Sequence, residues 1–473
     1  MKLIFPLLLA CCSTAYGKEN VTIHGKVTHR ISDSILVSPS ITQIAYQPIN
    51  YYARLDKEGN FSVTLTVPEG FTHVQITHGN QETEVYVQPG ADLTLTIDAS
   101  NFDSSLHYEG NGKELANFMA KHMLATPTMK KISIQGQMFF GKEQPAFKEE
   151  LKKLEDKELD FLRANSAGLP TGFSDYFKAS QRYEVYSVMA KYPSFHEMAK
   201  QKTMGVKNIP KENYAIIGDI PEAFNDDYIN MPAYYAYVTN VFYLQIFKDR
   251  AELNVPDSVA WPGDTTLTMA YERMPPKTAE FYAGSRIYSD TKKKPMELID
   301  REFATFKKHF PDRKGDMEII EHAIAFKKTI ANGKPEVDFD ITTPEGKTMK
   351  LSELKGNVVY IDFWSRGCVG CIAEMGASKK VREHFKDKPV RFVYVSLDPE
   401  ETIWKEAIKD FDIDGINTHV DQRFESDIVK KYGFYGIPAY FMVDKNGNFA
   451  HADDIARPGS TEKLIGQIEK LLE

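Results

Sequence analysis

The sequence is poor in cysteine: it has four in 473 residues, and two of them, Cys11 and Cys12, stand near its start. The other two, Cys368 and Cys371, are separated only by Val and Gly. A protein that relies on a framework of structural disulfides spreads its cysteines through the fold. The spacing therefore argues against such a framework and predicts that Cys368 and Cys371 form a reactive pair.

A strong excess of charge of either sign is also missing. The chain has 58 Lys and Arg against 66 Asp and Glu, and a net charge of −8 is mild for this length. Such a balance supports solubility and argues against nucleic acid or anionic lipid head groups as main partners. A hydrophobic content of 42% and a charged content of 26% are those of ordinary globular proteins. The length predicts about three domains.

Long hydrophobic runs are absent after the first residues. The apolar stretch 232–247 contains Thr, Asn and Gln and is shorter than the roughly 20 apolar residues that span a bilayer. Residues 1–17 combine Lys2, an apolar run and a small-residue end at Gly17, which predicts a secretory signal peptide. The stretch ending near Cys11 also resembles a bacterial lipoprotein signal, so clean cleavage and lipid anchoring both stay open. Either fate predicts an exported protein, in the periplasm or lipid-anchored at the cell envelope facing an extracytoplasmic space, with that anchor as its only membrane contact.

Three patterns of hydrophobic residues follow one another along the chain. Residues 18–105 alternate apolar and polar positions, as at 61–67, and predict an all-β, sandwich-like domain. Residues 111–332 switch to helical periodicity and predict an α-helical middle domain. Residues 335–473 alternate strands with helices, which predicts an α/β sheet covered on both faces. The predicted fold class is therefore multidomain, with an all-β, an α-helical and an α/β part.

The chemistry concentrates in residues 360–371, where an apolar strand leads into the cysteine pair in the run YIDFWSRGCVGC. This run resembles the active-site region of the thioredoxin superfamily. The resemblance implies that the pair opens a helix, where free backbone N–H groups and the helix dipole lower the pKa of Cys368 below about 8.5. It implies that Cys368 attacks as a thiolate and that Cys371, one turn into the helix, resolves the mixed disulfide. The implied activity is thiol–disulfide exchange through the Cys368–Cys371 disulfide, with no other cofactor and no metal.

Further landmarks make the sequence most similar to the TlpA-like and ResA-like members of this superfamily. They are LSELKG at residues 351–356, Glu374 after the second cysteine, and Gly-Ile-Pro at residues 436–438. The resemblance covers residues 335–473 and implies a thioredoxin-like fold with a cis peptide bond before Pro438. The client is then expected to bind at Trp364, Gly367, Ile437 and Pro438.

Two carboxylates of this region are candidates for acid–base chemistry. Asp362 matches the buried acid of thioredoxin, and it would take the proton of Cys371 when that thiol attacks. Burial on a strand would raise the pKa of Asp362. Glu374 lies one turn past Cys371 on the same helical face and matches an acid near the active site of ResA-like proteins. The alternatives are a purely structural role for Asp362 and a solvated helix side chain for Glu374.

Two departures from the usual site affect the expected direction of electron flow. Gly367 replaces the large residue that usually precedes the first cysteine, which opens the rim and is expected to change client choice. Val369 and Gly370 leave no His between the cysteines to stabilise the Cys368 thiolate, so a strongly oxidising protein is disfavoured. We therefore expect reduction or isomerisation of client protein disulfides, with electrons from a membrane-linked thiol donor.

Three other interpretations compete with this one. A zinc site would use the cysteine pair and His384, but a fourth ligand is missing, because the next histidine is His419. A peroxiredoxin would carry Pro and Thr at the positions of Ile361 and Ser365, yet a thiol-dependent peroxidase (antioxidant) activity of the pair itself stays open. Finally, the N-terminal two-thirds lack catalytic motifs and would fit a binding or scaffold protein in which the redox pair is secondary.

Overall fold

The computed structural model divides the chain into two compact units, Met1–Arg286 with Ala304–Asp316 and Ile287–Phe303 with Met317–Glu473. The predicted export signal, residues 1–17, lies outside the described residues. Within the part of the chain that is described, no helix is long and apolar enough to cross a membrane. The described residues are 19–41, 44, 51–126, 131–202, 209–241, 263–291, 294–398, 400–420, 426–434, 436–452 and 455–473.

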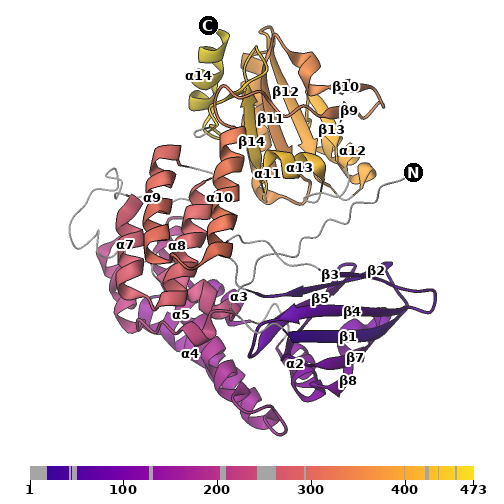
Figure 1. Ribbon diagram of the computed structural model, residues 1–473, viewed down its shortest axis with the longest axis vertical. Coiled ribbons are helices and arrows are strands. Elements are labelled where there is room, and N and C mark those ends of the chain that lie inside the picture. Colours follow the sequence, from indigo (N-terminus) through magenta and orange to yellow (C-terminus); the bar gives the residue numbers. More distant parts are fainter. Residues whose placement is uncertain are drawn as a thin grey trace. The chain divides into compact units, whose positions relative to one another are not determined.

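The first unit begins with a β-sandwich (Figure 1). One sheet has the strand order β4-β1-β7-β8 and the other has the order β3-β2-β5-β6. Alternate side chains of both sheets point inward, as the sequence pattern predicts, and Leu65 and Ile76 are buried in one cluster. β8 continues the sheet past residue 105, the predicted end of the β-rich domain, while the domain boundaries themselves stay predictions. The strands are β1 (Glu19–Thr28), β2 (Ser34–Pro39), β3 (Tyr51–Arg54), β4 (Asn60–Val67), β5 (Thr72–His78), β6 (Gln81–Val87), β7 (Asp92–Asp98) and β8 (His107–Asn111).

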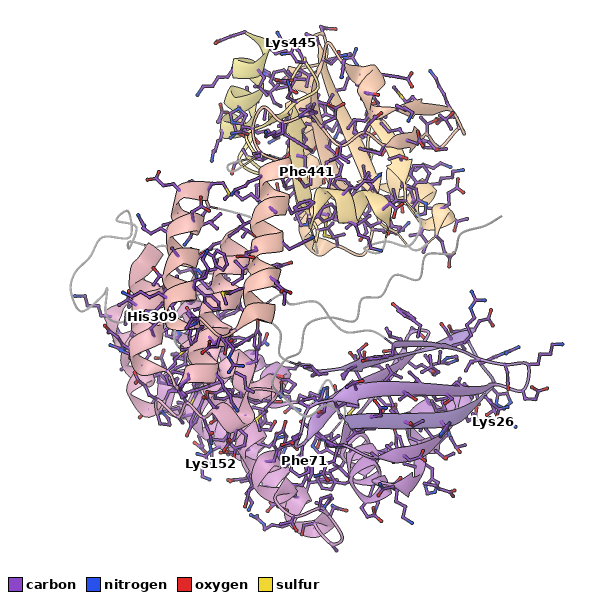
Figure 2. All side chains as sticks on the ribbon, in the orientation of Figure 1. Lys26, Phe71, Lys152, His309, Phe441 and Lys445 are labelled. Atoms are coloured by element: carbon purple, nitrogen blue, oxygen red, sulfur yellow. A yellow bond between two sulfur atoms is a disulfide. The ribbon has the colours of Figure 1, made fainter. Side chains whose placement is uncertain are left out.

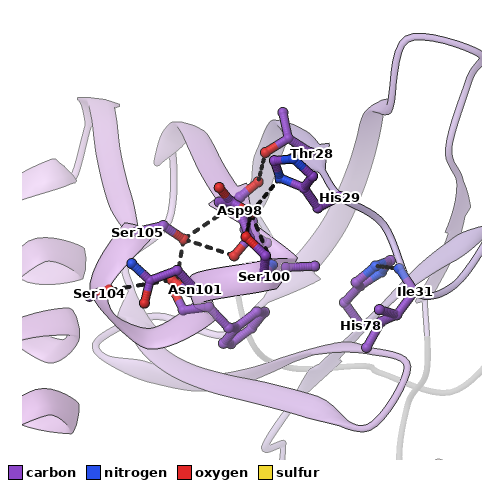
Figure 3. Close-up of polar contacts among 12 residues, drawn as sticks. Thr28, His29, Ile31, His78, Asp98, Ser100, Asn101, Ser104 and Ser105 are labelled. Carbon is purple, nitrogen blue, oxygen red and sulfur yellow. Dashed lines mark hydrogen bonds and ion pairs between the residues drawn. The ribbon is translucent and has the colours of Figure 1, made fainter.

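Asp98 organises the connection between β7 and β8 (Figure 3). Its Oδ1 accepts hydrogen bonds from the Ser100 hydroxyl (2.7 Å) and N–H (2.9 Å) and lies 2.8 Å from His29 Nδ1. These bonds lower the pKa of Asp98, the bond from the Ser100 hydroxyl most of all. The end of β1 is thereby fastened to the short helical turns η1 (Ala99–Asn101) and α1 (Phe102–Ser105).

Helices pack against the sandwich within the same unit. Phe71, labelled in Figure 2, contacts Phe173 with ring centroids 5.1 Å apart, and Tyr86 of β6 belongs to the same buried cluster. Leu151 and Leu154 of α4 also lie in this cluster, as the helical periodicity predicts. The predicted all-β and helical parts are therefore joined by shared hydrophobic packing. The helices are α2 (Lys113–Ala125), α3 (Ile132–Gln135), α4 (Gln144–Asn165), α5 (Phe173–Gln201), α7 (Gly263–Arg273) and α8 (Pro276–Asp290), with turns η3 (Gly136–Phe139), η4 (Lys211–Asp219) and η5 (Asp226–Tyr228).

A mostly buried ion cluster strengthens this junction. Glu84 on β6 lies 3.3 Å from His73 Nε2 and 2.5 Å from Lys131 Nζ, measured to its two carboxylate oxygens. Burial by itself raises the pKa of Glu84, but the hydrogen bond from His73 and the charges of His73 and Lys131 outweigh burial and lower that pKa to about 2. The ionised carboxylate is thus strongly favoured in the folded protein.

We predict that Glu84→Gln lowers the free energy of unfolding by about 2 kcal/mol at pH 5. A carboxylate whose pKa is lowered by folding stabilises the folded state above its unfolded pKa, about 4.3, and loses that contribution as the pH falls to about 2. Urea denaturation at pH 5 and pH 2 measures both values. Glu82→Gln, which changes an exposed acid of the same strand, is the control, and an equal deficit for Glu84→Gln at both pH values would contradict the prediction.

The second unit contains a sheet of strand order β13-β12-β11-β14-β15 (Figure 1). β11 pairs in parallel with β12 and antiparallel with β14. Tyr360 and Trp364 of β11 face a cluster that includes α11, α12 and α14, whereas Ile361 and Phe363 face a cluster that includes α13. The predicted α/β sheet with two covered faces is thus confirmed. Its elements are β9 (Asp340–Thr342), β10 (Thr348–Lys350), η6 (Leu351–Leu354), β11 (Val358–Trp364), α11 (Val369–His384), β12 (Val390–Ser396), α12 (Glu401–Asp410), β13 (Ile416–His419), α13 (Asp427–Tyr432), β14 (Ala439–Val443), β15 (Phe449–Ala450) and α14 (Thr461–Leu472).

The peptide that precedes this fold is tied to it. The Gly333 N–H donates to the Phe449 carbonyl and the Phe449 N–H donates to the Lys334 carbonyl, both at 2.8 Å, beside β15. Gly433, whose φ is 60°, faces Phe326 so closely that a Cβ there would lie 2.0 Å from the ring. Contacts of the α/β fold therefore begin before residue 335, its predicted start. Two helices precede it, α9 (Met296–His309) and α10 (Lys314–Thr329).

Candidate active site

The cysteine pair stands at the start of α11, directly after β11. Cys368 is the N-cap residue of the helix, and its Sγ accepts a hydrogen bond of 3.1 Å from the Cys371 N–H. The two sulfurs form a disulfide, with the Cα atoms 5.2 Å apart. Cys368 is half-buried, whereas Cys371 is only 1% exposed. Cys368 is therefore the sulfur that another protein can reach, and the N–H groups of the first helical turn favour its thiolate.

Asp398 holds the loop between β11 and the cysteines. Its carboxylate accepts the Arg366 N–H at 2.9 and 3.2 Å and the Ser396 hydroxyl at 2.8 Å, and the residue is 3% exposed. Sequence reasoning missed this residue. The available signal was an acid two residues past the end of β12, because the carboxyl ends of neighbouring parallel strands meet at one edge of a sheet.

We predict that Asp398→Ala lowers the free energy of unfolding by about 2 kcal/mol, because the Arg366 N–H loses its acceptor. Alkylation of Cys368 in the reduced protein should also slow, since its loop is no longer fixed. Urea denaturation and timed iodoacetamide labelling measure the two effects. Asp410→Ala is the matched control, because Asp410 is exposed and pairs with the Arg366 side chain, at 2.7 Å, and not with its backbone N–H. Equal effects of the two substitutions would show that the backbone bond is unimportant.

Asp362 is buried on β11, on the sheet face that carries Tyr360 and Trp364. It is 2% exposed, and its Oδ1 has no hydrogen-bond partner among the described residues. Burial raises the pKa of Asp362 to about 8, the negative charge of Glu374 adds to the rise, and Arg382 opposes it. At neutral pH the group therefore carries a proton for much of the time, yet it ionises within reach of physiological pH.

Glu374 lies one turn past Cys371 and is not a solvated helix side chain. Its Oε2 accepts a hydrogen bond from the Gly459 N–H, and its Oε1 lies 3.9 Å from the Arg457 guanidinium. The side chain is 16% exposed. Glu374 thus joins α11 to the loop before α14, and its carboxylate lies close enough to Asp362 to disfavour ionisation there.

The rim of the site combines an open position with the cis peptide. The Ile437–Pro438 bond is cis, as predicted, and a Cβ on Gly370 would lie 3.6 Å from Pro438 Cδ. A Cβ on Gly367 would meet nothing within 4 Å, which fits the expected open rim. Trp364 differs from its prediction: it is 0% exposed and packs in the cluster that contains Cys371. Its burial argues against a direct contact with a client, because a side chain at the end of a strand covered on both faces points into the core.

Metal ligands are not gathered around the cysteines. Among the described residues, no group of three or more His, Cys, Asp or Glu side chains is arranged to hold a metal ion. His384, the third ligand of the competing zinc interpretation, is the last residue of α11, and its Nε2 lies 3.0 Å from Glu469 Oε1 of α14.

Known proteins share this C-terminal part of the chain. The family model described as Redoxin matches residues 331–464. Thiol-disulfide oxidoreductase ResA of Bacillus thuringiensis subsp. konkukian (strain 97-27) is 30% identical over 139 residues, which are 29% of this chain and 78% of that protein. The chain belongs to the ResA-like thiol–disulfide oxidoreductases of the thioredoxin superfamily. ResA of Bacillus subtilis (strain 168) is 26% identical to this ResA-like chain over 155 residues, 33% of this chain and 83% of its relative. The thioredoxin domain of a thiol-disulfide oxidoreductase from Bacteroides vulgatus is 26% identical, covers 30% of this chain and 99% of its own, and has a TM-score of 0.28.

The predicted site residues of this ResA-like enzyme fall into three groups. Cys368 and Cys371 are bonded to each other, and Pro438 lies beside their helix. Asp362 and Glu374 form a second, mostly buried group on the side of α11 that faces the sheet. Trp364 supports the site from the core, and Gly367 and Ile437 lie at the rim, exposed and half-buried respectively.

Proposed function

We propose that this chain is an extracytoplasmic reductase of protein disulfides that works through a mixed disulfide on Cys368. The observation that carries the proposal is the pairing of a reachable sulfur at a helix N-terminus with a buried one in the next turn. The relatives named ResA are thiol–disulfide oxidoreductases. A thiolate at the first position and a shielded thiol at the second are the parts that such an exchange requires.

The proposed cycle moves two electrons from the enzyme to its client. The Cys368 thiolate attacks one client sulfur, the client S–S bond breaks, and one client thiolate leaves. Cys371 then gives its proton to Asp362 and attacks Cys368 Sγ, so that the Cys368–Cys371 disulfide forms and the second client thiolate leaves. A membrane-linked thiol donor returns the enzyme to its dithiol form. Neither a metal nor any cofactor besides the disulfide takes part in this proposal.

Client binding is assigned to the rim. We propose that the backbone beside the cis bond, at Ile437, pairs with an extended client segment next to Pro438, and that Gly367 leaves room for a bulky client side chain. Glu374 is proposed to act on Asp362 through its charge and not to contact the client, since Glu374 is held by Gly459.

The activity is tested with the full-length protein and insulin, whose chains precipitate when their disulfides are reduced by dithiothreitol. We expect precipitation well above the rate with dithiothreitol alone. We also expect a reduction potential nearer to the value of about −270 mV of thioredoxin than to the value of about −120 mV of DsbA, measured by equilibration in glutathione or dithiothreitol buffers. Folded protein without catalysis, or a potential as oxidising as that of DsbA, would defeat the reductase proposal.

Export and anchoring are tested separately. We propose that residues 1–17 direct the chain out of the cytoplasm. Cell fractionation combined with palmitate labelling, on the natural sequence and on Cys11→Ser and Cys12→Ser, separates a lipid anchor from clean cleavage. Label that is lost in one of these variants identifies the lipidated cysteine, and protein found only in the cytoplasm rejects export.

A second candidate is a binding protein whose redox pair is secondary. It is favoured by the size of the first compact unit, Met1–Arg286 with Ala304–Asp316, since the site residues named above belong to the second unit. Partners trapped on Cys368 are compared between the full chain and a chain without residues 20–286. A changed partner set supports recognition by the first unit, and an unchanged set removes that role.

A further inference from the structure

One half-buried tyrosine beside Asp362, whose hydroxyl is buried, is not used by the mechanism above. Tyr440 on β14 stands directly opposite Asp362 on β11 in their antiparallel pairing. Residues opposite one another in such a pair carry their side chains on the same face, with Cβ atoms about 4.5–5.5 Å apart. Tyr440 therefore lies on the sheet face that carries Asp362, the proposed proton acceptor, and that is covered by α11.

Both members of this pair have an unsatisfied buried polar atom. The Tyr440 hydroxyl and the Asp362 Oδ1 are inaccessible to solvent and have no hydrogen-bond partner among the described residues. Buried polar groups are nearly always bonded, and an orphan is costly unless the site uses it. A phenol O–H can donate a hydrogen bond to an ionised carboxylate, and an ionised carboxylate accepts hydrogen bonds without donating any. The two orphans are thus chemically complementary.

We propose that the Tyr440 hydroxyl donates a hydrogen bond to the Asp362 carboxylate when Asp362 is ionised and ready to take the proton of Cys371. The inference rests on the proposed reductase cycle and deepens it, with Tyr440 as a positioning residue. In the resolving step the proton moves from Cys371 Sγ to Asp362, the Cys371–Cys368 bond forms, and the Cys368–client bond breaks. Tyr440 keeps its own proton throughout.

The surroundings favour Tyr440 over the other donors. The Tyr394 hydroxyl is already occupied by Ser378 and Arg382, each at 2.6 Å. The Trp364 indole N–H is also an orphan, but it stands two residues from Asp362 along the strand, about 7 Å away, farther than a directly opposite residue. The Tyr440 ring is held by stacking on Tyr360, with centroids 5.6 Å apart.

The charges that face this pair come from several elements. Glu374 and Arg382 on α11 and Arg457 before α14 act on Asp362 or Tyr440 through their charges, and Tyr360 and Tyr394 line the same space. Arg457 pairs with Glu374 at 3.9 Å, and Arg382 contacts the Tyr394 hydroxyl. No cation is therefore bound directly to the Asp362 carboxylate within the described part of the chain, which leaves a neutral donor to stabilise its charge.

The test is Tyr440→Phe, which removes the hydroxyl and keeps the ring. Reduced full-length enzyme is mixed with an aromatic disulfide reporter in a stopped-flow instrument from pH 6 to pH 10. The first thiol released reports attack by Cys368, and the second reports resolution by Cys371. We expect the midpoint of the second phase to move about one pH unit toward alkaline pH, with a loss of about tenfold in rate at pH 7 and an unchanged alkaline plateau. The first phase should not change.

The controls separate this role from a structural one. Tyr360→Phe removes a hydroxyl that is bonded to the Ala456 carbonyl at 3.1 Å, and it should leave the midpoint in place. In an Asp362→Asn background, Tyr440→Phe should have no further effect on the second phase. A ¹³C titration of the Asp362 carboxyl by NMR gives the same midpoint without any activity, should Tyr440→Phe fold poorly enough to slow turnover.

Two failures can be told apart. If the natural sequence itself releases no second thiol, the proposed reductase cycle is wrong. If it does, but Tyr440→Phe keeps the natural midpoint in both the kinetics and the NMR titration, or only lowers the plateau, then Tyr440 does not act on Asp362.

Discussion

Cys368→Ser abolishes the reduction of client disulfides, whereas Cys371→Ser stops the same reaction one step later, with the client still attached to Cys368. Cys368 is the sulfur at the helix N-terminus that a client can reach. Its loss removes the nucleophile, and we expect at least a thousandfold fall in insulin reduction, because a serine hydroxyl does not ionise near neutral pH. Cys371 is 1% exposed and adjacent to that sulfur, so its loss leaves attack intact and removes resolution.

Trapping experiments distinguish the two variants directly. Both are made with Cys11→Ser and Cys12→Ser, so that no other cysteine of the chain contributes. Non-reducing electrophoresis and mass spectrometry should find client proteins linked to Cys368 in Cys371→Ser and none in Cys368→Ser. Clients linked to Cys371 in Cys368→Ser would reverse the assigned order of the two thiols.

Asp362→Asn makes the oxidised protein more stable at alkaline pH and a slower enzyme. Folding raises the pKa of Asp362 to about 8, against an unfolded value near 3.9. The folded state therefore binds a proton that the unfolded state has lost, and folding becomes costlier as the pH rises from about 4 to about 8. The cost approaches about 6 kcal/mol above pH 8, as an upper bound, and vanishes below pH 4. An asparagine side chain does not ionise, so Asp362→Asn does not carry this cost.

Urea denaturation at pH 4 and pH 9 measures the change in stability. We expect Asp362→Asn to gain several kcal/mol over the natural sequence at pH 9 and little at pH 4. Resolution of the mixed disulfide should fall by about 100-fold, the scale of a lost general base. Asp412→Asn, an exposed acid paired with Lys379, is the control and should change stability little. If Asp362→Asn raised the free energy of unfolding equally at both pH values, ionisation of Asp362 would not be the cause of the gain.

Local patterns predicted much of this molecule. Alternation predicted the sandwich strands, because an inward and an outward face follow from the two-residue period of a strand. The alternation of strands with helices predicted a sheet covered on both faces. The resemblance at the cysteine motif implied the helix start, and the resemblance at residues 436–438 implied the cis bond before Pro438. Each of these features depends on residues close together in the chain.

Features that depend on distant residues were not visible. Asp398 and Arg366 are 32 positions apart, and only the pairing of β11 with β12 brings them together. Tyr440 faces Asp362 only through the register of β14. Trp364 was wrongly assigned to the client surface, since the motif gives its position in the chain but not the helices that cover it. The packing of Phe71 on Phe173 likewise joins two segments that the periodicity separated.

The burial of Cys371 also determines how fast thiol reagents react with each of the two cysteines. An alkylating or oxidising molecule that meets the dithiol form reaches Cys368 and is kept from its neighbour by the packing of α11 on the sheet. The reduced protein therefore titrates as one fast thiol and one slow thiol, although both belong to a single redox couple. A single modification at the fast thiol silences the couple, while the protected sulfur next to it remains able to expel the adduct whenever that adduct is a disulfide.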